Sequence, residues 1–556
     1  MTHTRSLLLS ALLVAACGDD DSPTDAGADA ALPDAATSDA AIDDAGLEDA
    51  GLDAGDPAPG AWQLPEANRV GAQLAMYPLY PRPDAETAPG AYHRVAHPAV
   101  PYRVRLAVQG GEWPFRYELL EAPAGARVVA GELDRREEGD RIVHERTPGY
   151  GVVEWAAPDS GTHAFRAQVT DQSGETVELA WTVAVDEDAF VFVDAENGDD
   201  AAAGTFAAPL RTFAEGLWKN DDDDTTFAGR VAVFRAGAYD VYAAEPLTSP
   251  ILNVTDKPGA FVGMPGEAVT LDLSQGHFRT TRRGGMDDFL VAGIDFVGSR
   301  PDLGNVRLFN ITDRSARVTF WEVSFDQTTL GTSATDNPAC LAFMADGPFH
   351  ENLAVLDSVL GPDAAAQLVV TFDSRHVLWE GNRAEGVFLE ASNGDNFLHA
   401  KDDTNDLTIR DNLFVGRVAN SAIAVTNQIT MESAANQEVC WNRVVYDANQ
   451  NVDSAIAFNA QSTTPDAANA HAYRNSVVSQ RRAFRFRGSN VADPIPVHAE
   501  ANALWGAEGG GLGGNVDLGP VDNVVLEADD FDETAGLVGA AREAHAGFAG
   551  ADIVAR

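Results

Sequence analysis

A unit of strand, Asn and second strand recurs along the C-terminal part of the chain. Its Asn residues are separated by 30, 30, 33 and 27 residues. A repeat of this length between short apolar strands is typical of a wide β-solenoid, in which stacked coils bury one another's apolar faces. Asn also tolerates the left-handed bend between two strands, and stacked Asn side chains can form a hydrogen-bonded ladder. We therefore expect stacked β-coils with Asn at one corner: Asn382, Asn412, Asn442, Asn475 and Asn502.

The same repeat separates two cysteines. Cys340 and Cys440 lie a little over three coils apart in the Asn register. At about 4.8 Å per coil the separation is on the order of 16 Å, beyond the roughly 7 Å between Cα atoms that a disulfide tolerates. We predict two free, buried thiols.

Two segments near the start of the repeats resemble a known family. Residues 190–213 contain Phe-Val-Phe-Val-Asp-Ala-Glu-Asn-Gly and then Pro-Leu-Arg-Thr-Phe, and residues 229–239 read Gly-Arg-Val-Ala-Val-Phe-Arg-Ala-Gly-Ala-Tyr. Both resemble the first coils of pectate-lyase-like proteins. The resemblance implies a right-handed parallel β-helix over residues 188–530, followed by a C-terminal cap or tail over 531–556. It also implies a capping helix from Leu210 to Trp218, where apolar residues recur at helical spacing.

Residues 61–187 have a different pattern. Apolar residues occupy every second position from Val177 to Val185, which indicates a half-buried strand, and the turn at 171–174 joins it to another. The segment resembles bacterial immunoglobulin-like or cadherin-like modules, which implies a small all-β sandwich. We interpret it as a spacer, and Asp171 as a turn residue rather than a Ca²⁺ ligand.

The first 17 residues have the three parts of a secretory signal peptide. Arg5 precedes an apolar run from Leu7 to Val14, and Ala15 and Ala16 lead into Cys17. The run is shorter than the roughly 20 residues that span a bilayer. The junction resembles a bacterial lipobox, which implies a lipoprotein with lipidation at Cys17. The alternative is an ordinary signal peptide with Cys17 incidental.

Residues 18–60 form an Asp- and Ala-rich segment with no Lys, Arg or aromatic residue. Such a composition cannot bury enough apolar surface to fold, so we expect a disordered tether. Gly18 follows Cys17, where Asp would favour inner-membrane retention in bacterial lipoproteins. We therefore expect an exported protein, lipid-anchored to the cell envelope and displayed at the outer membrane or cell surface.

The charge balance excludes some partners. The chain has 38 Lys and Arg against 85 Asp and Glu, a net charge of −47. Nucleic acids and anionic membrane surfaces require concentrated positive charge. We therefore expect a protein that binds no nucleic acid and contacts membranes only through its lipid anchor, and we expect it to be a monomer.

The side chains that point outward from the coils are the candidates for binding, because a β-helix presents them at regular spacing along a parallel sheet. Alternation predicts Leu398 and Ala400 inside, with Phe397, His399 and Lys401 outside. The equivalent strands are predicted to bury Val370 and Phe372 with Thr371 outside, to bury Ile456 and Phe458, and to bury Phe484 and Phe486. The predicted outward row is Asp373, His399, Lys401, Asn459, Arg485 and Arg487.

Lys401 is one of only three lysines, in a chain that otherwise uses Arg. Unlike Arg, Lys can lose its proton and act as a base. Residues 401–412 resemble the Lys-containing coil of alginate-lyase and chondroitinase-type β-helix enzymes. That resemblance implies Lys401 as base, and His399, on the same predicted outward side, is the second catalytic candidate. It implies Ca²⁺ as cofactor, with oxygen ligands from Asp373, Asp402 and Asp403.

Two observations keep other interpretations open. Those enzymes carry an Arg acid in the following coil, but residues 421–427 contain none. Lys401 could instead pair with Asp373 or Asp402 in a polar turn. Arg485 and Arg487, with Asn459, could bind an anionic glycan or could be solvated. We favour a cell-surface lipoprotein whose β-helix binds an extracellular polysaccharide. The alternative is a polysaccharide lyase that acts by β-elimination on a uronate-containing glycan, so enzyme activity stays open.

Overall fold

The structure, a computed structural model, describes most of the chain after residue 73. Cys17, the segment 18–60 and Asp403 lie outside the described residues. The described ranges are 74–138, 141–145, 147–218, 225–241, 251–253, 259–274, 277–279, 286–300, 307–312, 314–330, 339–344, 349–361, 367–387, 396–402, 404–418, 420–427, 436–446, 454–460, 469–479, 482–488, 495–505, 508–514, 516–525, 531–532 and 536–537.

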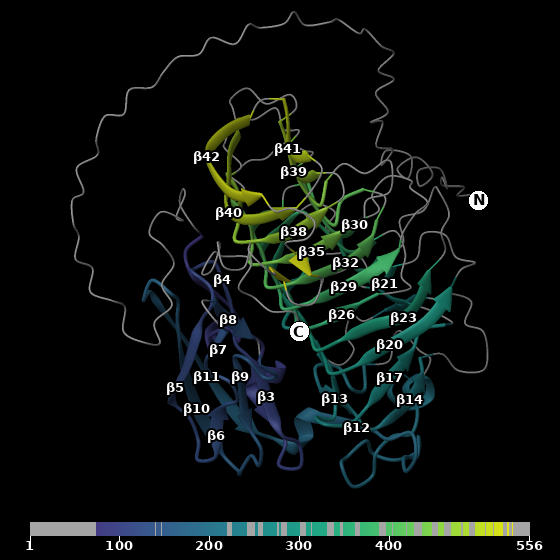
Figure 1. Ribbon diagram of the computed structural model, residues 1–556. Coiled ribbons are helices and arrows are strands. Elements are labelled where there is room, and N and C mark those ends of the chain that lie inside the picture. Colours follow the sequence, from purple (N-terminus) through teal and green to yellow (C-terminus); the bar gives the residue numbers. More distant parts are fainter. Residues whose placement is uncertain are drawn as a thin grey trace, which may run out of the picture. The chain divides into compact units, whose positions relative to one another are not determined.

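The long C-terminal region is a solenoid whose coils consist of three strands each. Strands on the same face of successive coils pair in parallel, as in β25 with β28 and β30 with β33. Figure 1 shows this stack, in which β17, β20, β26, β29, β32, β35 and β38 follow one another from teal to yellow-green. The predicted fold class, an all-β parallel β-helix preceded by a small β-sandwich, is confirmed.

We name the three faces A, B and C, in the order in which each coil passes through them. Face A contains β12 (Phe190–Val193), β13 (Val231–Phe234), β16 (Ala260–Gly263), β19 (Leu290–Ala292), β22 (Ala316–Trp321), β25 (His350–Leu356), β28 (Ser374–Glu380), β31 (Asn405–Arg410), β34 (Asn436–Cys440), β37 (Asn469–Tyr473) and the first part of β40 (Ile495–Trp505).

Face B follows face A after a short corner. It contains β14 (Gly237–Asp240), β17 (Val269–Asp272), β20 (Asp295–Arg300), β23 (Ser324–Leu330), β26 (Val359–Leu360), β29 (Arg383–Val387), β32 (Leu413–Arg417), β35 (Arg443–Tyr446), β38 (Ser476–Ser479) and the second part of β40. The last strand of this sheet, β42 (Val516–Val525), pairs with both parts of β40.

Face C is a separate parallel sheet that closes each coil. It contains β15 (Ile251–Asn253), β18 (His277–Arg279), β21 (Arg307–Ile311), β24 (Ala339–Met344), β27 (Gln367–Phe372), β30 (Asn396–Lys401), β33 (Ile423–Asn427), β36 (Ile456–Ala460), β39 (Arg482–Gly488) and β41 (Glu508–Gly514). In the region of the expected C-terminal cap or tail, β43 (Phe531–Asp532) and β44 (Gly536–Leu537) pair antiparallel.

The predicted asparagine ladder is present at the corner between faces A and B. Asn442 Nδ2 donates to Asn475 Oδ1 at 3.0 Å and to the Ile409 carbonyl at 2.8 Å, and Asn412 Nδ2 donates to Asn442 Oδ1 at 2.9 Å. The same pattern joins Asn382 to Asn412 and Asn475 to Asn502. The ladder therefore provides hydrogen-bond partners for buried amides and carbonyls at the corner, where the chain leaves one sheet for the next.

The left-handed residue at this corner is not the Asn. It is the residue before it: Gly381, Asp411, Trp441 and Arg474 have φ of 78°, 53°, 58° and 56°. The prediction that Asn takes the left-handed conformation is therefore wrong. The Asn side chain is instead turned inward to form the ladder.

The N-terminal end of the solenoid is closed by a single helical turn rather than by a helix from Leu210 to Trp218. The π-helical turn η5 (Phe213–Leu217) begins after Thr212, whose Oγ1 accepts hydrogen bonds from the Glu215 and Gly216 amides at 3.1 and 3.0 Å. Phe213, Leu217 and the flanking Leu210 and Trp218 are all buried in the core cluster of the coil interior. The apolar pattern therefore predicts the buried residues of the cap, but not the length of its helical segment.

Neither Cys340 nor Cys440 forms a disulfide, and both are buried, as predicted. Cys340 lies on β24 of face C and Cys440 on β34 of face A. The two residues therefore differ in face as well as in coil. Within the described residues, no helix has the length and apolarity that crossing a membrane requires.

The N-terminal module is a two-sheet β-sandwich with two additional strand pairs. Its predicted hairpin is present, with Phe165 opposite Trp181 and Val169 opposite Val177. The first sheet has the order β2 (Val95–Ala96), β11 (Thr176–Val185), β10 (Thr162–Thr170), β5 (Arg116–Glu121), and the second has the order β3 (Tyr102–Arg105), β9 (Val152–Trp155), β6 (Ala126–Val128). The pairs are β1 (Tyr77–Tyr80) with β4 (Ala107–Gln109) and β7 (Asp134–Glu138) with β8 (Arg141–Glu145), and the 3-10 turns are η2 (Asp84–Glu86), η3 (Tyr92–Arg94) and η4 (Glu187–Ala189).

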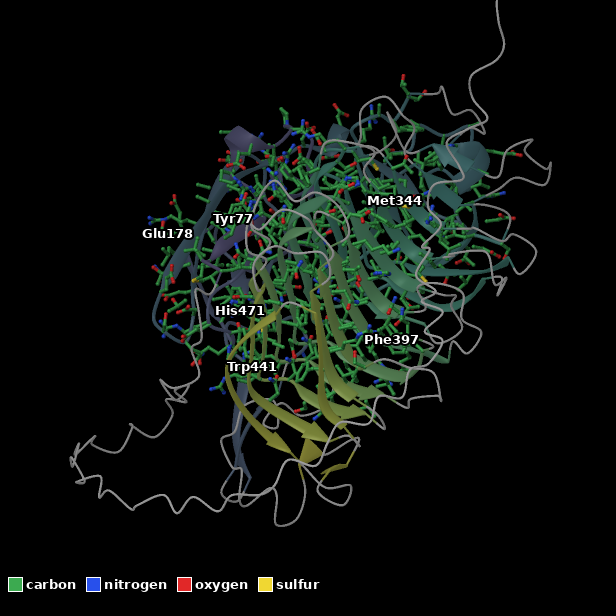
Figure 2. The ribbon with its side chains drawn as sticks, turned by 90° about the horizontal axis from the view of Figure 1, so that it is seen from above. Tyr77, Glu178, Met344, Phe397, Trp441 and His471 are labelled. Carbon is green, nitrogen blue, oxygen red and sulfur yellow. The ribbon has the colours of Figure 1, made fainter. Side chains whose placement is uncertain are left out.

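The sandwich is packed against face A, and its role as a spacer stays a prediction. One continuous hydrophobic cluster contains sandwich residues and outward residues of face A, including Trp321 and Leu378. Tyr77, labelled in Figure 2, stacks on His376 of β28 with ring centroids 4.0 Å apart. Outward apolar residues of face A require a cover in water. Face A therefore offers no open binding surface along this contact.

Candidate functional site

The predicted site residues on strands all belong to face C. Strand register places Ala342, Val370, His399, Ala424, Ala457 and Arg485 in one column across successive coils. A second column, two residues further along each strand, contains Met344, Phe372, Lys401, Thr426, Asn459 and Arg487. Leu398 and Ala400, which alternate with these two positions on β30, lie in the core cluster of the coil interior. Both columns therefore point outward.

The orientation predicted for β27 is wrong by one residue. Val369, not Val370, pairs with inward Leu398, and Thr371 pairs with inward Ala400. Val370 and Phe372 therefore face outward, and both belong to a small apolar cluster separate from the interior core. β27 is apolar on both sides, so alternation alone could not choose its register.

Phe397 also differs from its prediction. It is buried in the interior cluster and stacks on Phe414 of β32, with ring centroids 6.2 Å apart. Figure 2 labels Phe397 among the stacked strands. The strict outward alternation in β30 therefore begins only at His399, because Phe397 stands at the corner where the chain enters face C.

Lys401 and His399 lie two residues apart on the outward side of β30. The Lys401 Nζ atom lies 5.5 Å from the centroid of the Phe372 ring on the neighbouring strand, a distance at which a cation is attracted to the ring face. His399 is 5% exposed. Burial, and next the charge of Lys401, hold the pKa of the His399 imidazole well below its usual value. The pair therefore consists of a partly buried ammonium and a neutral imidazole.

The next three strands of face C carry polar groups beside Lys401. Thr426 on β33 is the register partner of Lys401, and Asn459 on β36 is the partner of Thr426. The Asn459 Oδ1 atom is buried and has no hydrogen-bond partner. Arg485 on β39 is partly buried. Arg487 pairs with Asn459 in the register, but its side chain lies outside the described residues.

The carboxylates predicted to bind Ca²⁺ lie at the ends of the strands, not on them. Asp373 and Asp402 follow β27 and β30, one coil apart, and both have left-handed φ, of 42° and 54°. Among the described residues, no three His, Cys, Asp or Glu side chains gather closely enough to hold a metal ion. Asp403 lies outside them, so the Ca²⁺ site stays a prediction.

Thr426 and Ala424 occupy the outward positions of the coil that follows Lys401. The lyases that the Lys401 segment resembles would have an Arg acid in that coil. The arrangement therefore provides a cation, hydroxyl and amide groups and a neutral imidazole, but no Arg beside Lys401 on β33.

Sequence reasoning missed two contributors to this face. Asn396, which is fully buried, contacts the His399 ring, and the Thr426 hydroxyl contacts its other side. Asn396 is the first residue of β30, three residues before His399. A polar residue at the start of an apolar strand was the sequence signal that could have identified it. The partnership with Thr426 depends on strand register and has no local signature.

The fold defines this chain as a parallel β-helix protein. No family model and no curated protein matches it. Among solved structures, it is similar to XylC in complex with xylose, with 9% identity over 58% of this chain and 69% of that chain and a TM-score of 0.37. It is also similar to the GH136 lacto-N-biosidase from Eubacterium ramulus, with 10% identity over 60% and 67% and a TM-score of 0.30. The catalytic domain of GH87 alpha-1,3-glucanase in complex with nigerose has 10% identity over 77% and 83% and a TM-score of 0.20. Likenesses this weak carry no argument about function.

Proposed function

We propose that this chain is a cell-surface lipoprotein whose β-helix binds an extracellular polysaccharide along face C. The observation that carries the proposal is the row Lys401, Thr426 and Asn459 on three consecutive strands, which ends in a buried amide oxygen without a partner. An unmet acceptor of this kind has an energetic cost that a ligand hydroxyl would remove. Strands spaced about 4.8 Å apart present such groups at intervals close to one sugar unit.

The rest of the molecule is compatible with this role. The sandwich covers part of face A, whereas face C carries the cations Lys401 and Arg485 at outward register positions. These cations stand out in a chain of net charge −47, and they favour an anionic glycan. Export, lipidation at Cys17 and the tether over 18–60 rest on the N-terminal sequence and belong to the same proposal.

Binding is tested by isothermal titration of the full chain with alginate, pectate, chondroitin and a neutral glucan. We expect at least one acidic glycan to bind, with affinity lowered about tenfold in Lys401→Ala and in Asn459→Ala. The matched control is Arg166→Ala, which removes a half-exposed cation on β10 of the sandwich. Absence of binding across the panel, or equal losses in the control, would overturn the proposal.

A second candidate is polysaccharide lyase activity. It is favoured by one observation, the neutral His399 beside Lys401 on the same side of β30. In this candidate Lys401 is the base, and the neutral imidazole beside it adds no second positive charge. Ultraviolet absorbance from unsaturated uronates distinguishes it from binding alone. Activity that disappears in Lys401→Ala would support it, and binding without absorbance change would exclude it for the glycans tested.

A further inference from the structure

A short chain of hydrogen bonds leads from the coil interior to face C and begins at Asn396. The Ser421 backbone N–H donates to Asn396 Oδ1 at 3.0 Å. An amide side chain has one acceptor oxygen and one donor nitrogen. The contact with Ser421 therefore determines the orientation of the Asn396 amide, with its oxygen toward Ser421. The Asn396 Nδ2 atom therefore faces His399, and lies 3.3 Å from its Nδ1.

This contact determines the tautomer of His399. Because Asn396 Nδ2 can only donate, His399 Nδ1 must accept. In a neutral ring the other nitrogen then carries the proton, and His399 Nε2 lies 3.4 Å from Thr426 Oγ1. The lowered pKa of His399 is consistent with a neutral ring. The ring therefore donates to the Thr426 hydroxyl.

This hydrogen bond orients the Thr426 hydroxyl on the outward side of the sheet. A hydroxyl has one proton, and when its oxygen accepts from His399 that proton is left to donate elsewhere. Thr426 lies between Lys401 and Asn459 in the outward column. The middle of the row is therefore a donor, with a second donor, the ammonium, on one side and the unpartnered Asn459 Oδ1 acceptor on the other.

We propose that His399 is a positioning residue that acts through Thr426, and that the row selects an acidic glycan. A carboxylate or sulfate oxygen would bind at Lys401 and Thr426, and a hydroxyl of the next sugar unit would donate to Asn459. The inference rests on the proposed function. It assigns His399 a role in orienting a donor rather than in proton transfer, and it predicts that the anionic group binds one strand away from the hydroxyl.

The tautomer is tested without any ligand. The full chain, with ¹⁵N-labelled histidine, is examined by long-range ¹⁵N–¹H correlation at pH 7, and the His399 signals are assigned by their loss in His399→Gln. We expect the Nε2–H tautomer, with Nδ1 unprotonated. An Nδ1–H tautomer or a protonated ring would overturn the relay.

The ligand class is tested with galacturonate, mannuronate and chondroitin sulfate oligosaccharides, and with carboxyl-reduced galacturonate. We expect an acidic probe to bind about tenfold more weakly to Thr426→Val, which lacks the hydroxyl, and to regain affinity in Thr426→Ser. Thr270→Val on β17 of face B serves as the matched control. Tighter or equal binding of the reduced probe would exclude the acidic class, and an unchanged Thr426→Val would exclude the relay while leaving glycan binding intact. If no glycan binds to the wild type, the proposed function and this ligand assignment both fail, whatever the tautomer.

Discussion

Arg105 of the sandwich donates a hydrogen bond to Glu380 of the β-helix across 275 residues of sequence. Both side chains are buried, at 0% and 1% exposure. The second oxygen of Glu380 accepts from Arg410 Nε at 2.8 Å, and Arg105 Nε also donates to Asp357 at 3.0 Å. One carboxylate thus joins two guanidinium groups, so the sandwich and face A are held together by a buried ionic network as well as by apolar contact.

Replacing Glu380 with Ala leaves two buried guanidinium groups without their shared partner. Removal of one member of a buried ion pair typically costs about 3–5 kcal/mol. We expect a loss of this size in the free energy of unfolding, measured by denaturant titration. The control is Arg127→Ala, which breaks an exposed pair with Glu154 and should cost about 1 kcal/mol or less. Equal effects of the two variants would contradict a structural role for the network.

The asparagine ladder predicts a large cost for its interior members. Asn442 Oδ1 accepts from the backbone amide and the side chain of Asn412, and Asn442 Nδ2 donates to Asn475 Oδ1 and to the Ile409 carbonyl. Each buried group left unsatisfied costs about 1–3 kcal/mol. We expect Asn442→Ala to lower the free energy of unfolding by at least about 3 kcal/mol in denaturant unfolding, much more than the exposed-pair control Arg127→Ala. Equal losses in the two variants would be inconsistent with the ladder as described.

Glu438 of β34 makes stability depend on pH. Its carboxyl is 1% exposed, and Oε1 accepts from the Leu74 amide at 2.9 Å while Oε2 has no hydrogen-bond partner. Burial raises the pKa of Glu438 from its usual 4.5 to about 7. The folded state therefore holds this proton more tightly than the unfolded state does, and stability decreases as pH rises from about 4.5 through 7.

The size of that decrease is at most about 3.5 kcal/mol, since one pKa unit corresponds to about 1.4 kcal/mol. We expect Glu438→Gln, which is neutral at every pH, to lose less stability than the wild type between pH 5 and pH 8. The measurement is urea unfolding at intervals across this range. Parallel pH profiles for the two proteins would show that Glu438 does not titrate there.

The solenoid could be predicted from sequence because its signal is periodic. The ladder asparagines recur about every 30 residues, and each copy repeats the same local chemistry. Interior Leu398 and Ala400 follow from alternation in β30, a strand with one polar side. In β27 both sides are apolar, so the same reasoning reversed Val370 and Thr371.

The contact between the sandwich and face A could not be predicted. Arg105, Glu380 and Arg410 are separated by 275 and 30 residues, and nothing in their local sequence distinguishes them from solvated charges. The candidate site likewise depends on contacts between residues that are distant in sequence. His399 and Lys401 follow from the pattern of one strand, but Thr426 joins them only through the register between strands.

The most direct test of the central claim is to map where a bound glycan protects the chain. Hydrogen–deuterium exchange of the full chain is compared with and without the tightest-binding acidic glycan from the titration panel. We expect slower exchange in β30, β33 and β36, and unchanged exchange in β10 and β11 of the sandwich. Protection confined to the sandwich or to face B, or no protection in any peptide while the glycan is bound, would contradict binding on face C.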